Sequence, residues 1–148
     1  IFQNKLLPVS SELIDLREVS LPMAGTDDGW TSEQVARLKE AVERASHVVF
    51  AVPIYCYDVN AAAKNVIELV GRTLTKKVVG FVCAAGGENS YMSVMGFANH
   101  LMLDFRSVIC PRFVYVTDNS WNTFGHLNSD VEKRLSTLVS DLKEIQVG

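Results

Sequence analysis

The chain has 148 residues, of which 48% are hydrophobic and 21% are charged, and its formal net charge is −3. This size predicts one domain with a sizeable core, and the charge balance argues against nucleic acid or an anionic membrane as partner. No apolar run approaches the ~20 residues that a bilayer span needs. The three cysteines form no CxxC pair, which favours reduced thiols and a cytoplasmic protein.

The first elements predicted along the chain are a strand and a helix. Residues 11–19 give a moderate strand signal, and a loop rich in Gly and Asp follows. Thr31 or Ser32 can cap a helix, and Thr31 with Gln34 fits a capping box. The apolar positions of this helix repeat at helical spacing, at Val35, Leu38, Val42 and Ala45.

Two continuous apolar runs, at 47–52 and 78–84, are the strongest features of the sequence. Continuous rather than alternating apolar residues are typical of parallel strands that are covered on both faces. Between them, Asp58 or Asn60 can cap a helix that ends at Gly71. We therefore predict two buried parallel strands joined by a helix.

The second half of the chain continues the alternation. A helix rich in Met and Phe is predicted over about 90–105, and a strand at 113–116 is bounded by Pro111. The final helix is predicted to start near Ser129 or Asp130. Its apolar stripe consists of Val131, Leu135, Leu138, Leu142 and Ile145.

Regular alternation of strands and helices predicts an α/β fold, a three-layer doubly wound parallel sheet. In such sheets ligands bind outside the carboxyl ends of the strands. The loops at 53–58 and 84–90 follow the two buried strands, so they are the candidate site. Small residues in the second loop would let the backbone approach a ligand closely.

At these loops the sequence resembles the NAD(P)H-dependent FMN reductase family of flavodoxin-like proteins. The first match is Pro53-x-Tyr55, followed by a polar turn and a helix with Ala63-Lys64-Asn65. The second is Ala84-Ala85-Gly86-Gly87, which is similar to the Gly-Gly turn of the family. The third runs from 13–16 to 21–22, which resembles the family's second strand and its exit. The resemblance covers nearly the whole chain.

The resemblance implies a flavodoxin-like fold with FMN and NAD(P)H as cofactors. It implies hydride transfer from NAD(P)H to bound FMN and on to a quinone, free flavin, metal or other acceptor, in a homodimer or homotetramer. The residues expected to bind the cofactor are Pro53, Ile54, Tyr55, Cys56, Ala84, Ala85, Gly86, Gly87, Glu88, Asn89 and Ser90. No catalytic side chain and no metal ligand is expected, because the flavin performs the hydride chemistry.

The sequence departs from the family at its start. The family opens with a strand and a phosphate-binding loop of the type Gly-Ser-x-Arg-x-x-Ser, which this sequence does not contain. We therefore expect one flavodoxin-like domain whose first strand precedes Ile1 and lies between the strands at 11–16 and 47–52. The alternative function is a flavodoxin-like binding or structural subunit that does not hold FMN.

Several residues also have interpretations that need no flavin. Tyr57 can serve packing or an interface, and Cys56 has no histidine near it in sequence that would make it a nucleophile. The cluster of Met and Phe at 92–105 is either core that faces the sheet or a contact with another subunit.

Overall fold

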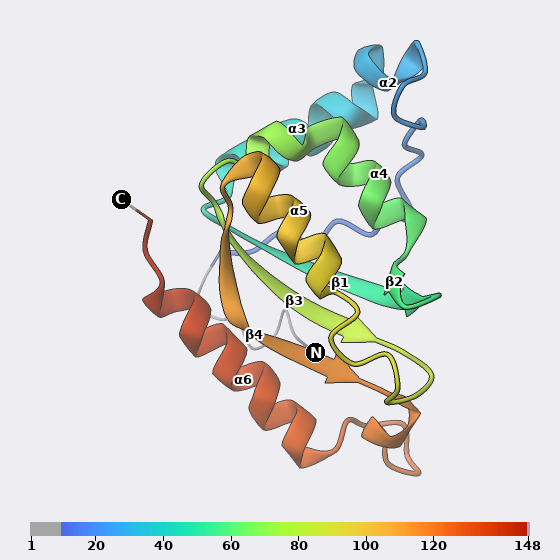
Figure 1. Cartoon of the computed structure of the whole chain (residues 1–148), viewed down its shortest axis with the longest axis vertical. Coiled ribbons are helices and arrows are strands. Elements are labelled where there is room, and N and C mark those ends of the chain that lie inside the picture. The colour runs from blue at the N-terminus through green and yellow to red at the C-terminus, as the bar shows by residue number, and fades with distance from the viewer. Residues whose placement is uncertain (1–9, 148) are drawn as a thin grey trace.

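Three parallel strands form the centre of the computed structural model, which describes residues 10–147 (Figure 1). β1 (His47–Tyr55), β3 (Val78–Ala84) and β4 (Val108–Val116) lie side by side in that order. The short β2 (Asp58–Val59) runs antiparallel to the end of β1. The predicted parallel sheet is confirmed, and the bounds of β3 are those expected from its apolar run.

Helices cover both faces of this sheet, as predicted. α3 (Glu33–Arg44), α4 (Ala61–Val70) and α5 (Met95–Phe105) pack on one face, and α6 (Ser129–Glu144) packs on the other (Figure 1). Three shorter elements are α2 (Asp28–Thr31) and the 3-10 helices η1 (Gly71–Leu74) and η2 (Asp118–Ser120). Within residues 10–147, no helix is long and apolar enough to cross a membrane.

The alternation of side chains along β3 explains its continuous apolar run. Val79, Phe81 and Cys83 lie in the core beneath α3, α4 and α5. Val78 and Val82 belong to the core beneath α6. Because successive side chains of a strand point to opposite faces, a strand between two helical layers needs apolar residues at every position.

A cluster of aromatic rings forms the centre of the larger core. Phe81 is fully buried, and its ring centroid lies 6.1 Å from that of Phe50, 6.1 Å from Phe97 and 5.3 Å from Phe113. These residues come from three strands and from α5. Phe81 therefore joins the sheet to the helical layer above it.

The strand predicted at 11–19 is wrong. Residues 11–15 have no regular secondary structure, and a turn follows at 16–18. Asp15 accepts hydrogen bonds from the guanidinium and the backbone N–H of Arg17, and these bonds lower the pKa of the Asp15 carboxyl to about 2. No strand within residues 10–147 lies beside this segment to complete a hydrogen-bonded ladder, so the segment does not form a strand.

Asn65 holds the end of this segment against α4. Its Nδ2 donates to the carbonyl of Pro22 at 2.9 Å, and its Oδ1 accepts from the N–H of Ala24 at 2.8 Å. Asn65 is buried, so both halves of its amide need these partners. The Asn of the Ala63-Lys64-Asn65 motif therefore has a structural role in this chain.

Two strands are longer than predicted. β1 continues through Pro53, and β4 begins at Val108, with Pro111 inside it rather than at its boundary. The pairing of β3 with β4 shifts register between Val79 and Phe81, opposite this proline. β4 is an edge strand, and a bulge on an edge tolerates a residue that cannot donate a ladder hydrogen bond.

One helix begins at a predicted cap, and another begins later than predicted. Ser32 is the N-cap of α3, but Thr31 belongs to α2, so the predicted capping box with Gln34 does not form. α5 begins at Met95, and turns occupy most of 86–94, where the sequence predicted a helix from Ser90. The apolar residues of this turn region resemble the apolar face of a helix, which explains why the sequence predicted an earlier start.

β1 has an open edge opposite β3. Among residues 10–147 this edge pairs only with β2, at Ile54 and Tyr55. Ala51 is exposed and Val49 is half-buried on the face toward α6. The strand expected beside β1 lies outside the described residues and stays a prediction.

The position directly after α4 requires a glycine, Gly71, because the Phe105 ring lies close to its backbone. A Cβ on Gly71 would lie 2.2 Å from Cζ of Phe105, whereas its backbone conformation is ordinary (φ −56°). A glycine is therefore required here by contact with a ring and not by a left-handed turn.

Gly71→Ala is expected to lower the free energy of unfolding by about 1–3 kcal/mol, because the methyl group must displace the Phe105 ring. Urea denaturation followed by circular dichroism measures this loss. Gly86→Ala is the control, since its Cβ would have no neighbour within 4 Å. If the two variants unfold at the same urea concentration, Phe105 does not pack against Gly71.

Candidate functional site

The carboxyl ends of the parallel strands meet at one edge of the sheet. Pro53 of β1 pairs with Ala84 of β3, and Ala84 pairs with Val116 of β4. The N–H of Ala85 donates to the carbonyl of Val116 at 2.9 Å. The arrows of all three strands point to the lower right of Figure 1, where their loops gather. The structure thus brings together the two loops that the sequence singled out.

The first loop is a tight β-hairpin that sequence reasoning did not predict. Cys56 and Tyr57 connect β1 to β2, and both have positive φ, 52° and 61°. Two positive φ values are characteristic of a type I′ turn, which usually contains Asn-Gly. The sequence did not indicate this hairpin because Cys56-Tyr57 is not the Asn-Gly pair typical of such a turn.

The residues expected to bind the cofactor in this loop differ in exposure. Tyr55 and Tyr57 have 63% and 69% of their surface exposed, and Cys56 is exposed. Pro53 is half-buried, and the side chain of Ile54 is buried in the core. Only the backbone of Ile54 is therefore available to a ligand.

The second loop contains two glycines that the fold itself does not require. A Cβ on Gly86 or Gly87 would have no described atom within 4 Å, and neither residue has a positive φ. The N–H groups of Gly86, Gly87 and Asn89 have no hydrogen-bond partner within residues 10–147. These donors are free to bind a ligand, and no side chain obstructs it.

The far end of the second loop is fixed to β4. Ser90 and Tyr115 share a hydrogen bond between their hydroxyls, and the Tyr91 ring packs edge-on against Tyr115 at 5.6 Å. Met92 has φ 71° in this loop. Of the five non-glycine residues with positive φ in the described chain, Cys56 and Tyr57 lie in the first candidate loop and Met92 lies in the turns directly after the second. Backbone strain of this kind is found preferentially at functional sites.

A third loop, at 117–128, lies beside the second and was not predicted as part of the site. Ser120 fixes it, because Ser120 Oγ accepts from the N–H of Thr117 and its carbonyl accepts from Asn128, both at 2.9 Å. Trp121 and Phe124 are exposed in this loop. Exposed aromatic residues between a strand and a capped helix were the signal that could have indicated it.

A polar pocket of about 450 Å³ lies between the second and third loops. It is lined by Glu88, Tyr91, Tyr115, Thr117, Asn119, Ser120, Asn128, Asp130, Val131 and Arg134. The carboxylates of Glu88 and Asp130 and the guanidinium of Arg134 are its charged groups. This pocket extends the candidate site toward the start of α6.

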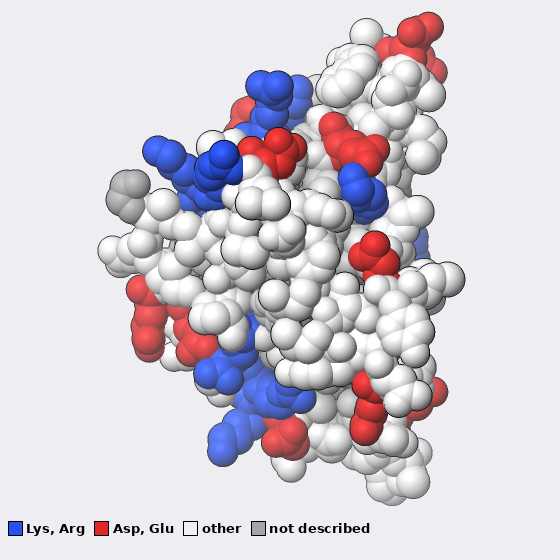
Figure 2. Space-filling view, in the orientation of Figure 1, with Lys and Arg blue, Asp and Glu red and all other residues white. Residues whose placement is uncertain are grey.

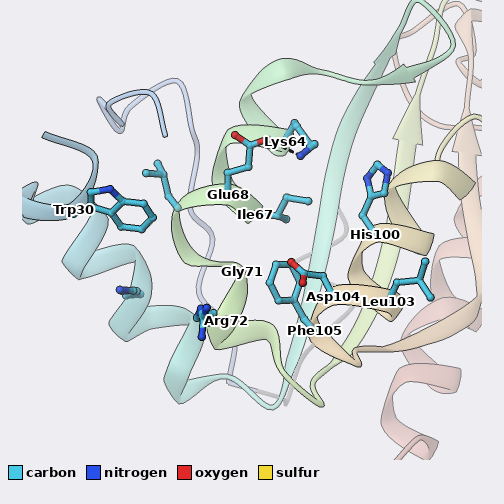
Figure 3. A pocket seen from close by; sticks show the side chains of 12 residues that line it. Trp30, Lys64, Ile67, Glu68, Gly71, Arg72, His100, Leu103, Asp104 and Phe105 are labelled. Carbon is cyan, nitrogen blue, oxygen red and sulfur yellow. Dashed lines mark hydrogen bonds and ion pairs between the residues drawn. The ribbon is translucent and has the colours of Figure 1, made fainter. Parts of the chain in front are cut away.

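A larger hollow of about 620 Å³ lies away from the strand ends, in the outer helical layer (Figure 3). Figure 3 shows Trp30 on one side and His100 and Leu103 of α5 on the other. Lys64 and Glu68 of α4 form an ion pair at 2.6 Å in its wall. No residue of the three loops lines this hollow, so its size does not make it the candidate site.

The two buried thiols, of Cys83 and Cys110, are not activated as nucleophiles. Cys83 is buried, and its burial raises the pKa of the thiol to about 12. Burial also raises the pKa of the Cys110 thiol. In the part of the chain that the structure describes, no group of three or more His, Cys, Asp or Glu residues could hold a metal ion.

Comparison with known proteins links this geometry to one class of enzyme. A family model described as NADPH-dependent FMN reductase matches residues 2–122. An NAD(P)H-dependent FAD/FMN reductase of Geobacillus thermodenitrificans is 26% identical over 133 residues, which cover 88% of this chain and 72% of that protein.

Solved structures share the fold at lower identity. FerB, a flavoenzyme NAD(P)H:(acceptor) oxidoreductase from Paracoccus denitrificans, has a TM-score of 0.74 and 19% identity over 95% of this chain and 82% of its own. An oxidoreductase from Corynebacterium diphtheriae has a TM-score of 0.65 and 16% identity. That match covers 75% of this chain, which spans only 60% of the length of the Corynebacterium protein.

Proposed function

Because the chain belongs to the NADPH-dependent FMN reductase family, we propose that it is an oxidoreductase whose FMN site lies across the carboxyl ends of β1 and β3. The fold is flavodoxin-like, and FMN and NAD(P)H are the cofactors of the family. Bound FMN supplies a carrier that takes a hydride from NAD(P)H, leaving NAD(P)⁺, and passes it to a small acceptor, which also takes a solvent proton if it is a quinone.

The observation that carries this proposal is the open second loop. The backbone conformations at positions 86 and 87 do not require glycine, and a Cβ added to Gly86 or Gly87 would face empty space. A flat ring that approaches the backbone closely gives a physical reason for two glycines at this point. The free N–H groups of Gly86, Gly87 and Asn89 fit the oxygen and nitrogen acceptors along the edge of an isoalloxazine ring.

The remaining residues would complete the slot. Tyr55 presents an exposed aromatic ring from β1, and Glu88 lies between the free donors of the second loop. The proposed contacts are Pro53, the backbone of Ile54, Tyr55, Cys56, Ala84, Ala85, Gly86, Gly87, Glu88, Asn89 and the backbone of Ser90. Ser90's hydroxyl is engaged by Tyr115, so its role is to hold the loop.

Anaerobic titration tests the function. The purified protein, saturated with FMN and freed of excess, is mixed with NADH or NADPH while flavin absorbance is recorded. Stoichiometric bleaching, reversed by an added quinone or free flavin, is the expected result. Protein that retains no FMN would favour the alternative, a flavodoxin-like subunit without the cofactor.

Cys56→Ser is expected to keep the rate of NAD(P)H oxidation within about threefold of the parent, because hydride transfer through a flavin needs no thiol. Steady-state assays with matched FMN occupancy measure this rate. A loss of more than about a hundredfold, roughly 2.7 kcal/mol, with FMN still bound would give Cys56 a catalytic role.

We further propose a homodimer or homotetramer in the cytoplasm. Exposed Trp30 and Leu103 line the hollow of Figure 3, and α5 also exposes Met95 and Met102. Clustered apolar surface is typical of subunit contacts. Light scattering of the purified protein tests the assembly, and a monomeric mass would refute it. The unpaired cysteines and the use of NAD(P)H support the cytoplasm.

A further inference from the structure

Within residues 10–147, the three loops that form the rim of the proposed flavin site carry negative charge and no Lys or Arg. The loops at 55–60, 85–94 and 117–128 contain Asp58, Glu88 and Asp118, all of them exposed, and neither Lys nor Arg. In the lower half of Figure 2 the blue groups lie over α6, and the lower right, over the strand ends, is white and red. Arg134 of α6 lines the neighbouring pocket, where the carboxylates of Glu88 and Asp130 outnumber it.

The same rim holds most of the exposed aromatic surface of the described chain. Of the six exposed aromatic side chains, all but Trp30 lie in these three loops. The five are Tyr55, Tyr57, Tyr91, Trp121 and Phe124. Aromatic faces bind flat conjugated molecules, and their electron-rich faces also favour cations.

We propose, on the premise of the flavin site above, that this rim selects the electron acceptor by charge. Among acceptors, the site favours flat aromatic molecules that are neutral or cationic over anionic ones. NAD(P)H, itself an anion, meets the same negative potential and must be held by other contacts. Asp58, Glu88 and Asp118 are exposed in the segments that follow β1, β3 and β4, so this end of the sheet has a negative potential that lowers the local concentration of anions. The acceptor then receives its hydride beside aromatic rings. The loops contain no Lys or Arg that could form an ion pair with an anionic acceptor.

Binding of three anthraquinones that differ in one substituent tests this selection without turnover. The probes are neutral 2-(hydroxymethyl)anthraquinone, anionic anthraquinone-2-sulfonate and a cationic anthraquinone with a trimethylammonium-methyl group. Each is titrated into oxidised, FMN-loaded protein while tyrosine and tryptophan fluorescence is followed. The titrations are done at about 0.01 M salt, where the Debye length is about 30 Å, and at about 1 M, where it is about 3 Å.

We expect the sulfonate to bind about tenfold more weakly than the neutral probe at low salt, with most of this difference lost at high salt. The triple variant Asp58→Asn, Glu88→Gln, Asp118→Asn should remove most of the difference. The control triple variant Asp28→Asn, Glu43→Gln, Glu144→Gln changes the net charge equally at exposed residues outside the loops, and it should preserve the difference. The rate of flavin reoxidation by each probe should follow the same order.

Two results would overturn this inference while the flavin site stands. One is equal binding of sulfonate and neutral probe at low salt, and the other is an equal effect of the two triple variants. A protein that holds no FMN would overturn the proposed function itself, and the absorbance spectrum shows this before any probe is added.

Discussion

Gly86→Val is expected to weaken FMN binding about a hundredfold, which is about 2.7 kcal/mol, with no loss of folding stability. The valine side chain would occupy the space next to the free N–H groups of the second loop. Stability should persist because nothing lies within 4 Å of the new Cβ and the backbone conformation suits any L-residue. Flavin fluorescence titration measures the dissociation constant, and urea denaturation measures stability.

The matched control for this variant is Gly96→Val. Gly96 lies in α5, where its Cβ would also have no neighbour within 4 Å, but it is not part of the loops. The affinity for FMN should be unchanged in the Gly96→Val variant. An unchanged dissociation constant in Gly86→Val would mean that the second loop does not contact the flavin.

Phe81→Ala is expected to lower the free energy of unfolding by about 3–5 kcal/mol, a large fraction of the ~5–15 kcal/mol typical of a domain. The ring is fully buried and contacts three other phenylalanine rings, so its removal leaves a cavity at the centre of the sheet. Urea denaturation measures the loss. Phe124→Ala is the control, because Phe124 is 83% exposed and should contribute almost nothing. Similar losses in both variants would contradict this description of the core.

The elements that the sequence predicted well are those whose apolar pattern is set by the layers against which they pack. β3 is apolar at every position because both faces are covered, and α6 has a stripe of leucines that faces the sheet. The segment at 11–19 mixes apolar and charged residues and has no neighbouring strand in the described chain, and local pattern alone cannot supply that partner. Pro111 is tolerated because β4 is an edge strand with a bulge, which depends on the sheet order.

The position of the site was predictable from topology, but its details were not. Parallel strands bring Pro53 and Ala84 to one edge, so the two loops had to meet. The burial of Ile54, the strained turn at Cys56 and Tyr57 and the third loop at 117–128 depend on tertiary packing.

The Ala63-Lys64-Asn65 part of the first matched motif has a structural explanation. Ala63 is buried in the core, Lys64 pairs with Glu68, and Asn65 holds the segment at 22–24. None of these side chains is part of the three loops. In this chain the motif joins α4 to the segment at 22–24 and to the core.

Hydrogen exchange with and without FMN, read by mass spectrometry, tests the central claim most directly. FMN is expected to slow exchange in peptides that cover 53–60 and 84–94, because the free N–H groups of the second loop would donate to the flavin and the flavin would cover the backbone of the first loop. Peptides that cover 64–72 and 99–105, around the larger hollow, should be unaffected. Protection around that hollow with none in the two loops would contradict the proposed site.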